Sequence, residues 1–350
     1  MRVLVTGHNG YIGSVMVPIL SAAGHTVSGL DSFFFEGYAF TADLAAVATA
    51  RKDIRDVRPS DLEGSDAVIH LAWISDDPDT SPRITTIGEI NHEGAVHLAR
   101  SAREAGVSRF LFASSCSVYG MGPESAPLSE DAPVRPVTAG GISKVRAEEE
   151  ILRLADTRFS PVIMRSATAY GVSPRLRIDG VLNNLVCWAH STGQIRINSD
   201  GTPWRPLVHV EDIAHAFAAA LAARPEAIHA QVFNVGANSE NYQISELAEI
   251  VRGAVPGSTI DYLPELHRPQ LSYRVDFGKM SRTFADFRPR WNASFGAKDL
   301  YASLQEPGVA LENFHGRRYN RSAQLRHLIQ TGTVDAQLRF RHGTLAASQG

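Results

Sequence analysis

The 350-residue sequence has only two cysteines, Cys116 and Cys187, and no paired spacing of cysteines and histidines. Two cysteines cannot build a disulfide framework, and a structural zinc site needs a paired set of ligands. His209 and His215 lack a third ligand, so we interpret both as structural. We therefore expect a reducing, cytoplasmic setting and no metal.

Long apolar runs and an excess of one charge are also missing. No stretch approaches the roughly 18 apolar residues of a membrane-spanning helix, and the first residues do not follow the pattern of a signal peptide. The 34 basic and 37 acidic residues give a net charge of -3 and are interspersed, whereas nucleic-acid-binding proteins usually have a basic face. We therefore expect no membrane and no nucleic-acid partner.

Short apolar segments alternate with segments of helical periodicity through the first half of the chain. The pattern predicts strands at 3–6, 26–30, 67–71, 109–113 and 161–165, and helices at 11–23, 91–105 and 144–154. Strands that alternate with helices indicate an α/β protein with a Rossmann-type, doubly wound parallel sheet.

The elements become shorter beyond about residue 170, which predicts a smaller α/β substrate-binding lobe. We expect residues 1–170 to form the dinucleotide-binding Rossmann domain, with later segments around 205–240 rejoining it. Residues 171–330 then belong mainly to the substrate-binding lobe. Residues 344–350 are small and polar, and we expect a flexible tail there.

Three glycines at the first strand-to-helix turn suit the pyrophosphate of a dinucleotide. In the segment Gly7 to Gly13, they permit a tight turn, a close approach of the phosphates and close packing of helix on strand. Asp31 ends the second strand, where its carboxylate can accept hydrogen bonds from an adenosine ribose and repels the extra phosphate of NADP. No arginine stands beside Asp31 in the sequence, so the pattern favours NAD.

The Gly-x-x-Gly-x-x-Gly spacing resembles that of the short-chain dehydrogenase/reductase superfamily. Residues 112–120, Phe-Ala-Ser-Ser-Cys-Ser-Val-Tyr-Gly, are similar to the active-site strand of its extended branch. The resemblance covers roughly residues 1–300 and implies an NAD-dependent nucleotide-sugar epimerase or dehydratase; we also expect a homodimer. The cofactor contacts that it implies are Gly7, Gly10, Tyr11, Ile12, Gly13, Asp31, Asp53, Ile54, Leu71, Ala72, Asn91, Ser114 and Lys144.

The same resemblance exposes a gap in the catalytic set. It implies that Ser115 aligns the reacting hydroxyl and that Lys144 holds the nicotinamide ribose. The tyrosine of the family's Tyr-x-x-x-Lys pair, which transfers the proton, is Gly140 here. Another group transfers the proton, or the chain is a silent binding homologue, or the glycine is an introduced substitution. Lys144 and, as a thiolate, Cys116 are the candidate replacements.

Three functions follow from these alternatives. The leading interpretation is a nucleotide-sugar epimerase or related oxidoreductase that works by transient hydride transfer to bound NAD. The second is a catalytically silent protein that binds NAD and a nucleotide sugar, and the third is a net dehydrogenase or ketoreductase on another small alcohol. Dehydratases of this branch usually carry Asp-Glu where Cys116 and Ser117 stand, which disfavours elimination chemistry.

The resemblance also implies the residues that bind the nucleotide sugar. Residues 201–214 are similar to the segment that places an arginine on the substrate diphosphate, which gives Arg205; a guanidinium suits phosphate because it binds two oxygens at once. Residues 180–185 are similar to the family's Asn-Asn-Leu segment, which implies that Asn184 and Leu185 bind the substrate and that Asn184 approaches its diphosphate. Arg268 matches the second phosphate-binding arginine, and Thr168 stands where many relatives carry a sugar-contacting asparagine.

Four aromatic residues follow strands at the carboxyl edge of the predicted sheet, where open α/β folds bind ligands. Phe33, Phe34, Phe35 and Trp73 either line the sugar pocket or pack within the protein.

Overall fold

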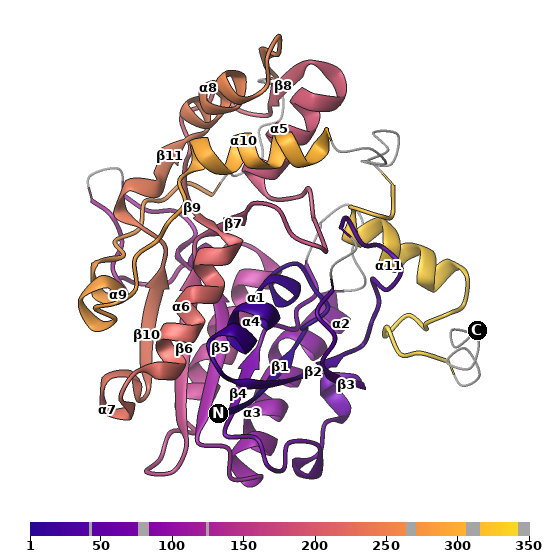
Figure 1. Cartoon of the computed structure of the whole chain (residues 1–350), viewed down its shortest axis with the longest axis vertical. Coiled ribbons are helices and arrows are strands. Elements are labelled where there is room, and N and C mark those ends of the chain that lie inside the picture. Colours follow the sequence, from indigo (N-terminus) through magenta and orange to yellow (C-terminus); the bar gives the residue numbers. More distant parts are fainter. Residues whose placement is uncertain (42–43, 76–83, 124–125, 264–270, 306–315, 342–350) are drawn as a thin grey trace.

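The computed structural model describes residues 1–41, 44–75, 84–123, 126–263, 271–305 and 316–341. Its centre is a seven-stranded parallel sheet in the order β10-β6-β5-β4-β1-β2-β3 (Figure 1). The strands are β1 (Arg2–Thr6), β2 (Thr26–Asp31), β3 (Ala48–Arg51), β4 (Ala67–His70), β5 (Arg109–Ser115), β6 (Ser160–Ser166) and β10 (Gln231–Val235). The strand order reverses between β1 and β4, and doubly wound folds bind ligands at such a switch point. The predicted Rossmann-type sheet is confirmed.

Alternating side chains of the strands bury both faces of this sheet. Val3, Val5 and Ile69 lie in one apolar cluster with α1 (Gly13–Ala22) and α6 (Val210–Ala222). Leu4 and Val68 belong to the opposite cluster, with α3 (Ala95–Glu104) and α4 (Ala139–Leu152). Burial on both faces explains why these strands are continuous apolar runs. The remaining helical elements of this part are α2 (Ile84–Gly88) and a π-helical turn, Glu89–Gly94.

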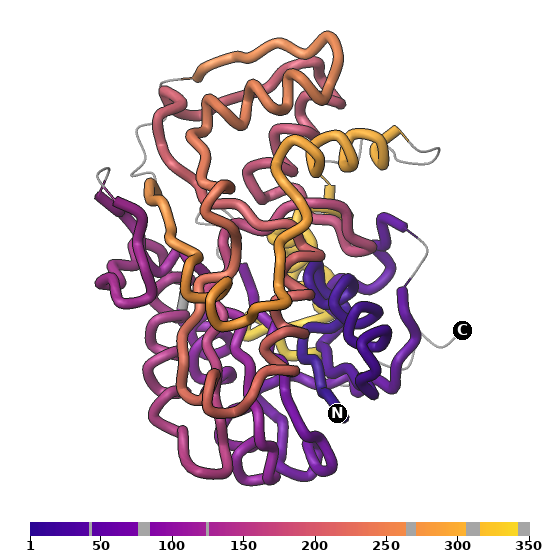
Figure 2. The backbone as a smooth tube through the Cα atoms, turned by 60° about the vertical axis from the view of Figure 1, so that its left-hand side comes forward, coloured from indigo at the N-terminus to yellow at the C-terminus, as the bar shows by residue number. Residues whose placement is uncertain are grey.

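A smaller lobe stands over the carboxyl edge of the sheet, in the upper part of Figures 1 and 2. Its strands form a three-stranded sheet of β7 (Thr168–Tyr170), β9 (Trp204–His209) and β11 (Asn241–Gln243), and a pair of β8 (Gln194–Ile197) and β12 (Thr259–Tyr262). The helices α5 (Val181–Thr192), α8 (Ile244–Ala254) and α10 (Ala293–Leu304) share its apolar core. Two short helices, α7 (Pro225–Ile228) and α9 (Gly278–Thr283), lie near β10.

Two segments differ from the expected division of the chain. Of the residues around 205–240, α6 and β10 pack with the large sheet, but β9 belongs to the three-stranded sheet of the smaller lobe. The last helix, α11 (Arg321–Gln330), was expected in the smaller lobe and instead packs on the large sheet near β2 and β3 (Figures 1 and 2). Leu325, Val334 and Leu338 share an apolar cluster with Leu30 of β2. Residues 344–350 lie outside the described residues.

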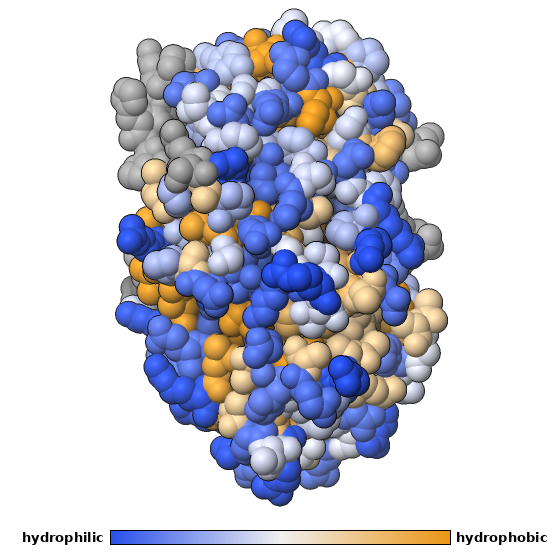
Figure 3. Space-filling view, turned by 90° about the vertical axis from the view of Figure 1, so that its left-hand side faces the viewer, coloured by the Kyte–Doolittle hydropathy of each residue, from blue (hydrophilic) through white to orange (hydrophobic). Residues whose placement is uncertain are grey.

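Figure 3 shows one face of the molecule coloured by hydropathy. Polar residues cover most of this face, and apolar residues gather in patches in its lower half. Among the described residues, no helix is long and apolar enough to span a membrane.

Candidate active site

The glycine-rich turn is too tight for any other residue at two of its positions. Gly7 has a φ of 71°, and a Cβ on it would approach the backbone nitrogen of Ala72 to 2.7 Å. A Cβ on Gly13 would approach the carbonyl oxygen of Gly7 to 2.3 Å. The turn therefore brings the start of α1 against the ends of β1 and β4. Free N–H groups at such a helix start suit a pyrophosphate, so this turn, with Gly10, Tyr11 and Ile12, fits NAD.

Asp31 lies beside this turn at the end of β2. Its carboxylate accepts hydrogen bonds from the backbone nitrogens of Asn9 (3.1 Å) and Phe33 (2.8 Å). Burial raises the pKa of Asp31, and these two donors together with the nearby His8 act in the opposite direction. The position agrees with a carboxylate that accepts hydrogen bonds from an adenosine ribose.

The next predicted cofactor contacts border the same edge. Asp53 begins a short 3-10 turn and binds Arg55 at 2.6 Å, and Ile54 behind it is buried. Leu71 and Ala72 follow β4, and the nitrogen of Leu71 donates to Thr6. Asn91 is fully buried, accepts from the nitrogen of Ile74 at 2.9 Å and donates to its oxygen at 2.7 Å. Asn91 thus fixes the loop that follows β4.

Lys144 is the most unusual charged residue of the site. It is 8% exposed, its Nζ donates to the carbonyl oxygen of Ala113 on β5, and the same atom lies 3.6 Å from the ring centroid of Trp73. Burial lowers the pKa of Lys144 to about 7, against the opposing effect of Glu148. The site therefore holds an amine that changes its charge near neutral pH.

The position of the missing tyrosine lies in the first turn of α4, the helix that carries Lys144. Thr138 caps this helix by accepting from the nitrogen of Gly141 at 3.0 Å. Gly140 is buried, and its φ is not positive. Ser115, at the end of β5, accepts from the nitrogen of Ser117 at 3.1 Å. The structure thus places Ser115, Lys144 and Gly140 on adjoining elements.

A buried polar network supports this arrangement from behind. Glu148, one turn after Lys144, accepts from Ser114 and pairs with Arg165 at 2.6 Å; the two side chains of the pair are 4% and 8% exposed. Arg165 also donates to the hydroxyl of Tyr119, which donates to Asn234 at 2.8 Å. The predicted cofactor contact Ser114 therefore uses its hydroxyl to hold α4 against β5.

Cys116 does not suit the role of a base. It is fully buried in the apolar core, and its thiol donates to the carbonyl oxygen of Arg165 at 3.1 Å. Burial raises the pKa of this thiol, whereas catalytic cysteines have lowered values and some exposure. These surroundings favour a structural role for Cys116 over that of a thiolate base.

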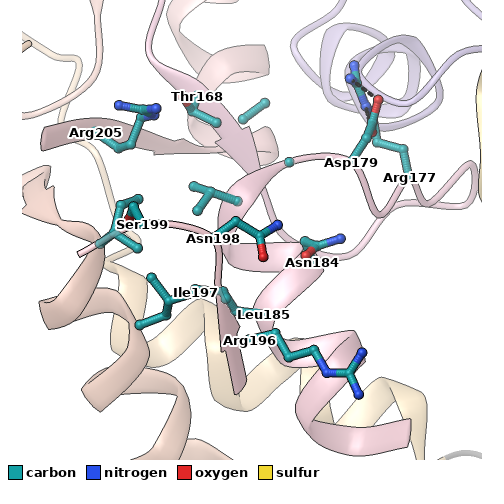
Figure 4. A pocket seen from close by; sticks show the side chains of 14 residues that line it. Thr168, Arg177, Asp179, Asn184, Leu185, Arg196, Ile197, Asn198, Ser199 and Arg205 are labelled. Carbon is teal, nitrogen blue, oxygen red and sulfur yellow. Dashed lines mark hydrogen bonds and ion pairs between the residues drawn. The ribbon is translucent and has the colours of Figure 1, made fainter. Parts of the chain in front are cut away.

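A pocket of about 560 Å³ opens in the smaller lobe, where four predicted substrate residues meet. Thr168 comes from β7, Arg205 from β9, and Asn184 and Leu185 from α5 (Figure 4). The remaining lining residues are Ala169, Arg177, Asp179, Gly180, Val181, Arg196, Ile197, Asn198, Ser199 and Ile244. Such a volume lies within the range of pockets for small-molecule ligands. Arg268 lies outside the described residues.

Arg205 is the pocket residue best suited to a phosphate. Among the described residues it forms no ion pair, and its recorded hydrogen bond goes to the backbone oxygen of Trp204 at 2.9 Å. Burial lowers the pKa of Arg205. By contrast, Arg177 is joined to Asp179 at 2.6 Å at the other end of the pocket (Figure 4). A guanidinium without a carboxylate partner favours an anionic ligand over a surface ion pair.

The four aromatic residues pack within the protein, and none of them belongs to the pocket lining. Phe34 stacks on Phe340 at 5.4 Å, and Phe35 lies under the guanidinium of Arg321 at 4.3 Å. Phe33 faces His8. These three pack against other parts of the protein, and Trp73 contacts Lys144.

The sequence analysis overlooked three arginines. Arg175, Arg177 and Arg321 lie close together in space. Arg321 stands far along the sequence from every segment that the analysis recognised. Only the short spacing of Arg175 and Arg177 after β7 could have drawn attention to them. No group of three or more potential metal ligands occurs among the described residues, and His209 stacks on Trp291 at 3.9 Å.

The fold and the geometry of the site are typical of enzymes that bind a dinucleotide beside a pocket for an anionic substrate. The model of the NAD dependent epimerase/dehydratase family matches residues 3–236. The chain belongs to this family, whose members are NAD-dependent enzymes of the extended short-chain dehydrogenase type.

Several similar proteins are named as epimerases of nucleotide sugars. A UDP-glucose 4-epimerase of Mycolicibacterium smegmatis is 33% identical over 285 residues, which cover 77% of this chain and 87% of the relative. A UDP-glucose 4-epimerase of Neisseria meningitidis is 29% identical over 290 residues, 75% and 84% of the two chains. The solved UDP-glucuronic acid 4-epimerase of Bacillus cereus, in complex with UDP-glucuronic acid and NAD, is 25% identical with a TM-score of 0.73, covering 87% of this chain and 99% of that one.

Proposed function

We propose that the protein inverts a hydroxyl-bearing carbon of a UDP-sugar by transient oxidation, with Lys144 as the proton-transfer group. The observation that carries the proposal is the buried Lys144 amine at the end of β5, which has a pKa of about 7. A general base works best when its pKa lies near the working pH. Lys144 meets this condition in a site that lacks the usual tyrosine.

The chemistry divides between NAD and the residues of the chain. When bound, NAD would supply a reversible hydride acceptor for the sugar carbon, which allows the configuration at that carbon to invert. Neutral Lys144 accepts the hydroxyl proton as the C–H bond breaks and gives it back when the hydride returns. Ser115 orients the same hydroxyl. The glycine-rich turn with Asp31 holds the cofactor.

The pocket residues fit the diphosphate end of the substrate. Arg205 provides an unpaired guanidinium, and Asn184 lies across the same space (Figure 4). The choice of a UDP-sugar is supported by the relatives named UDP-glucose 4-epimerase and by the UDP-sugar in a similar solved structure. The Cys-Ser pair at 116 and 117 disfavours elimination, so epimerisation is preferred to dehydration.

One observation favours a silent binding protein as the second candidate. The Nζ of Lys144 already donates to Ala113, and a base held in this way must exchange that hydrogen bond to reach a substrate. A protein of this kind binds NAD and UDP-sugar without turnover. A net dehydrogenase would instead accumulate NADH.

The experiment incubates the purified protein with NAD and UDP-glucose, UDP-galactose or UDP-glucuronic acid in turn. Inverted product in the NMR spectrum, without lasting absorbance at 340 nm, is the expected result. Lasting absorbance at 340 nm shows net oxidation, and binding of both ligands without any product shows the silent protein; either result rejects the epimerase. The expected homodimer and cytoplasmic location remain predictions, which light scattering and cell fractionation test.

A further inference from the structure

The segment that follows β7 is fastened to the start of α1. The hydroxyl of Tyr11 donates to the oxygen of Gly171 at 2.8 Å, and the hydroxyl of Ser173 donates to the oxygen of Tyr11 at 2.7 Å. Two nitrogens of Arg175 then donate to the side-chain oxygen of Asn9, at 3.1 and 2.8 Å. Arg175 is therefore held against the glycine-rich turn.

The last helix brings a second arginine to the same place. Arg321, the first residue of α11, donates from Nη2 to the carbonyl oxygen of Arg175 at 2.7 Å. Its guanidinium lies over the ring of Phe35 at 4.3 Å. Residues more than 140 positions apart in the sequence thus place two guanidinium groups beside one turn.

These two cations have no anionic partner in the described part of the chain. Arg175 is 3% exposed and Arg321 is 8% exposed, and the Nη1 atom of each is buried without a hydrogen-bond partner. The nearby Asp31 uses its carboxylate for backbone donors. Burial, with the adjacent Arg177 and Arg175, lowers the pKa of Arg321 to about 10, and Asp179 and Asp31 oppose this shift. Buried cations without a partner are costly, so an anion would relieve this cluster.

We propose that Arg175 and Arg321 form an anion site that binds the pyrophosphate of NAD together with the N-terminal end of α1. Arg175 is bonded to Asn9 of the glycine-rich turn, and Arg321 is bonded to Arg175. The turn itself offers the helix N–H groups that suit a phosphate. The diphosphate of the nucleotide sugar is the other available anion. Neither arginine lines the substrate pocket, where Arg205 takes that part. The C-terminal helix is thereby a component of the cofactor site.

The test titrates the full-length protein with three probes: ADP-ribose, which carries the pyrophosphate, adenosine, which lacks it, and UDP, which carries the substrate diphosphate. Arg321→Met is compared with Arg326→Met, which removes the same charge from an exposed position of the same helix. We expect Arg321→Met to weaken ADP-ribose binding by about 10- to 100-fold, the usual effect of one charged hydrogen bond. Adenosine and UDP binding should stay within about 2-fold, and Arg326→Met should match the parent protein.

Three results overturn the proposal. If Arg321→Met lowers the affinities for adenosine and ADP-ribose equally, Arg321 acts only by packing. If it lowers the affinity for UDP alone, the site belongs to the nucleotide sugar. Unchanged affinities for all three probes mean that there is no such anion site. Arg321→Lys guards against misfolding, because it retains the charge and should recover part of the ADP-ribose affinity. These titrations need no turnover, so the anion site stands or falls independently of the proposed epimerase activity.

Discussion

The Nζ atom of Lys144 lies 3.6 Å from the ring centroid of Trp73. The indole shields the amine from water while its ring face favours the charged form, and burial has the larger effect because the pKa of Lys144 is lowered to about 7.

The rate of epimerisation should therefore rise with pH through about 7 and then level off, because the neutral amine of Lys144 is the base. Lys144→Arg keeps a positive charge at every relevant pH. This variant should lose the epimerase activity and, with it, the rise of the rate through pH 7. Initial rates from pH 5.5 to 9 check the prediction. A parent rate that is flat over this range assigns proton transfer to another group.

Stability should depend on pH for the same reason. Between about 7 and about 10.4 the unfolded lysine remains protonated while folded Lys144 is neutral. The unfolded state then binds more protons, so the free energy of unfolding rises with pH across this window. Urea titrations at pH 7 and 9 should show a smaller rise for Lys144→Met than for the parent, whereas Lys298→Met, at an exposed position of α10, should leave the rise unchanged. The prediction is contradicted if the free energy of unfolding rises equally in all three proteins between pH 7 and pH 9.

Gly140→Tyr should raise turnover above that of the parent, because a positioned phenol adds an acid–base group beside Lys144. The φ of Gly140 is not positive and the residue lies in α4, so the backbone accepts a tyrosine. Gly140→Phe is the matched control, because it adds the ring without the hydroxyl. Equal turnover of the two variants, with NAD still bound, would show that the phenol has no place in this mechanism.

Arg205→Met should weaken binding of a UDP-sugar by roughly 1.5 to 3 kcal/mol, because a charged hydrogen bond to phosphate is lost. Binding of NAD should hardly change, since Arg205 lies in the smaller lobe. Arg252→Met, at an exposed position of α8, serves as control. Calorimetric titration measures all three proteins, and an affinity equal to that of the control returns Arg205 to a structural role.

Glu148→Gln should lower the free energy of unfolding by about 3 to 5 kcal/mol, because it leaves the buried guanidinium of Arg165 without a charged partner. The neighbouring Glu149→Gln removes an exposed pair with Arg153 and should cost at most about 1 kcal/mol. Urea denaturation compares them. Similar losses would mean that the Glu148 pair is no stronger than a surface pair.

The sequence was informative where burial imposes a pattern. The central strands are apolar on both faces, so β1, β4, β5 and β6 could be predicted, but every residue of β3 (Ala48–Arg51) is exposed and the strand leaves no such pattern. The four pocket residues could be foreseen because the motifs that contain them are local. Arg321 could not, because its role depends on contacts with Arg175 and Phe35 that no local pattern records.

The contacts of the C-terminal segment also bear on the order in which the chain acquires its shape. Arg339 pairs with Asp53 and Asp56, and Phe340 stacks on Phe34. During synthesis the ribosome delivers the N-terminal partners long before Arg339 and Phe340 emerge. The edge proposed to hold the adenosine half of NAD is therefore complete only once residues 339 and 340 have been made, so the sheet can form before this surface does.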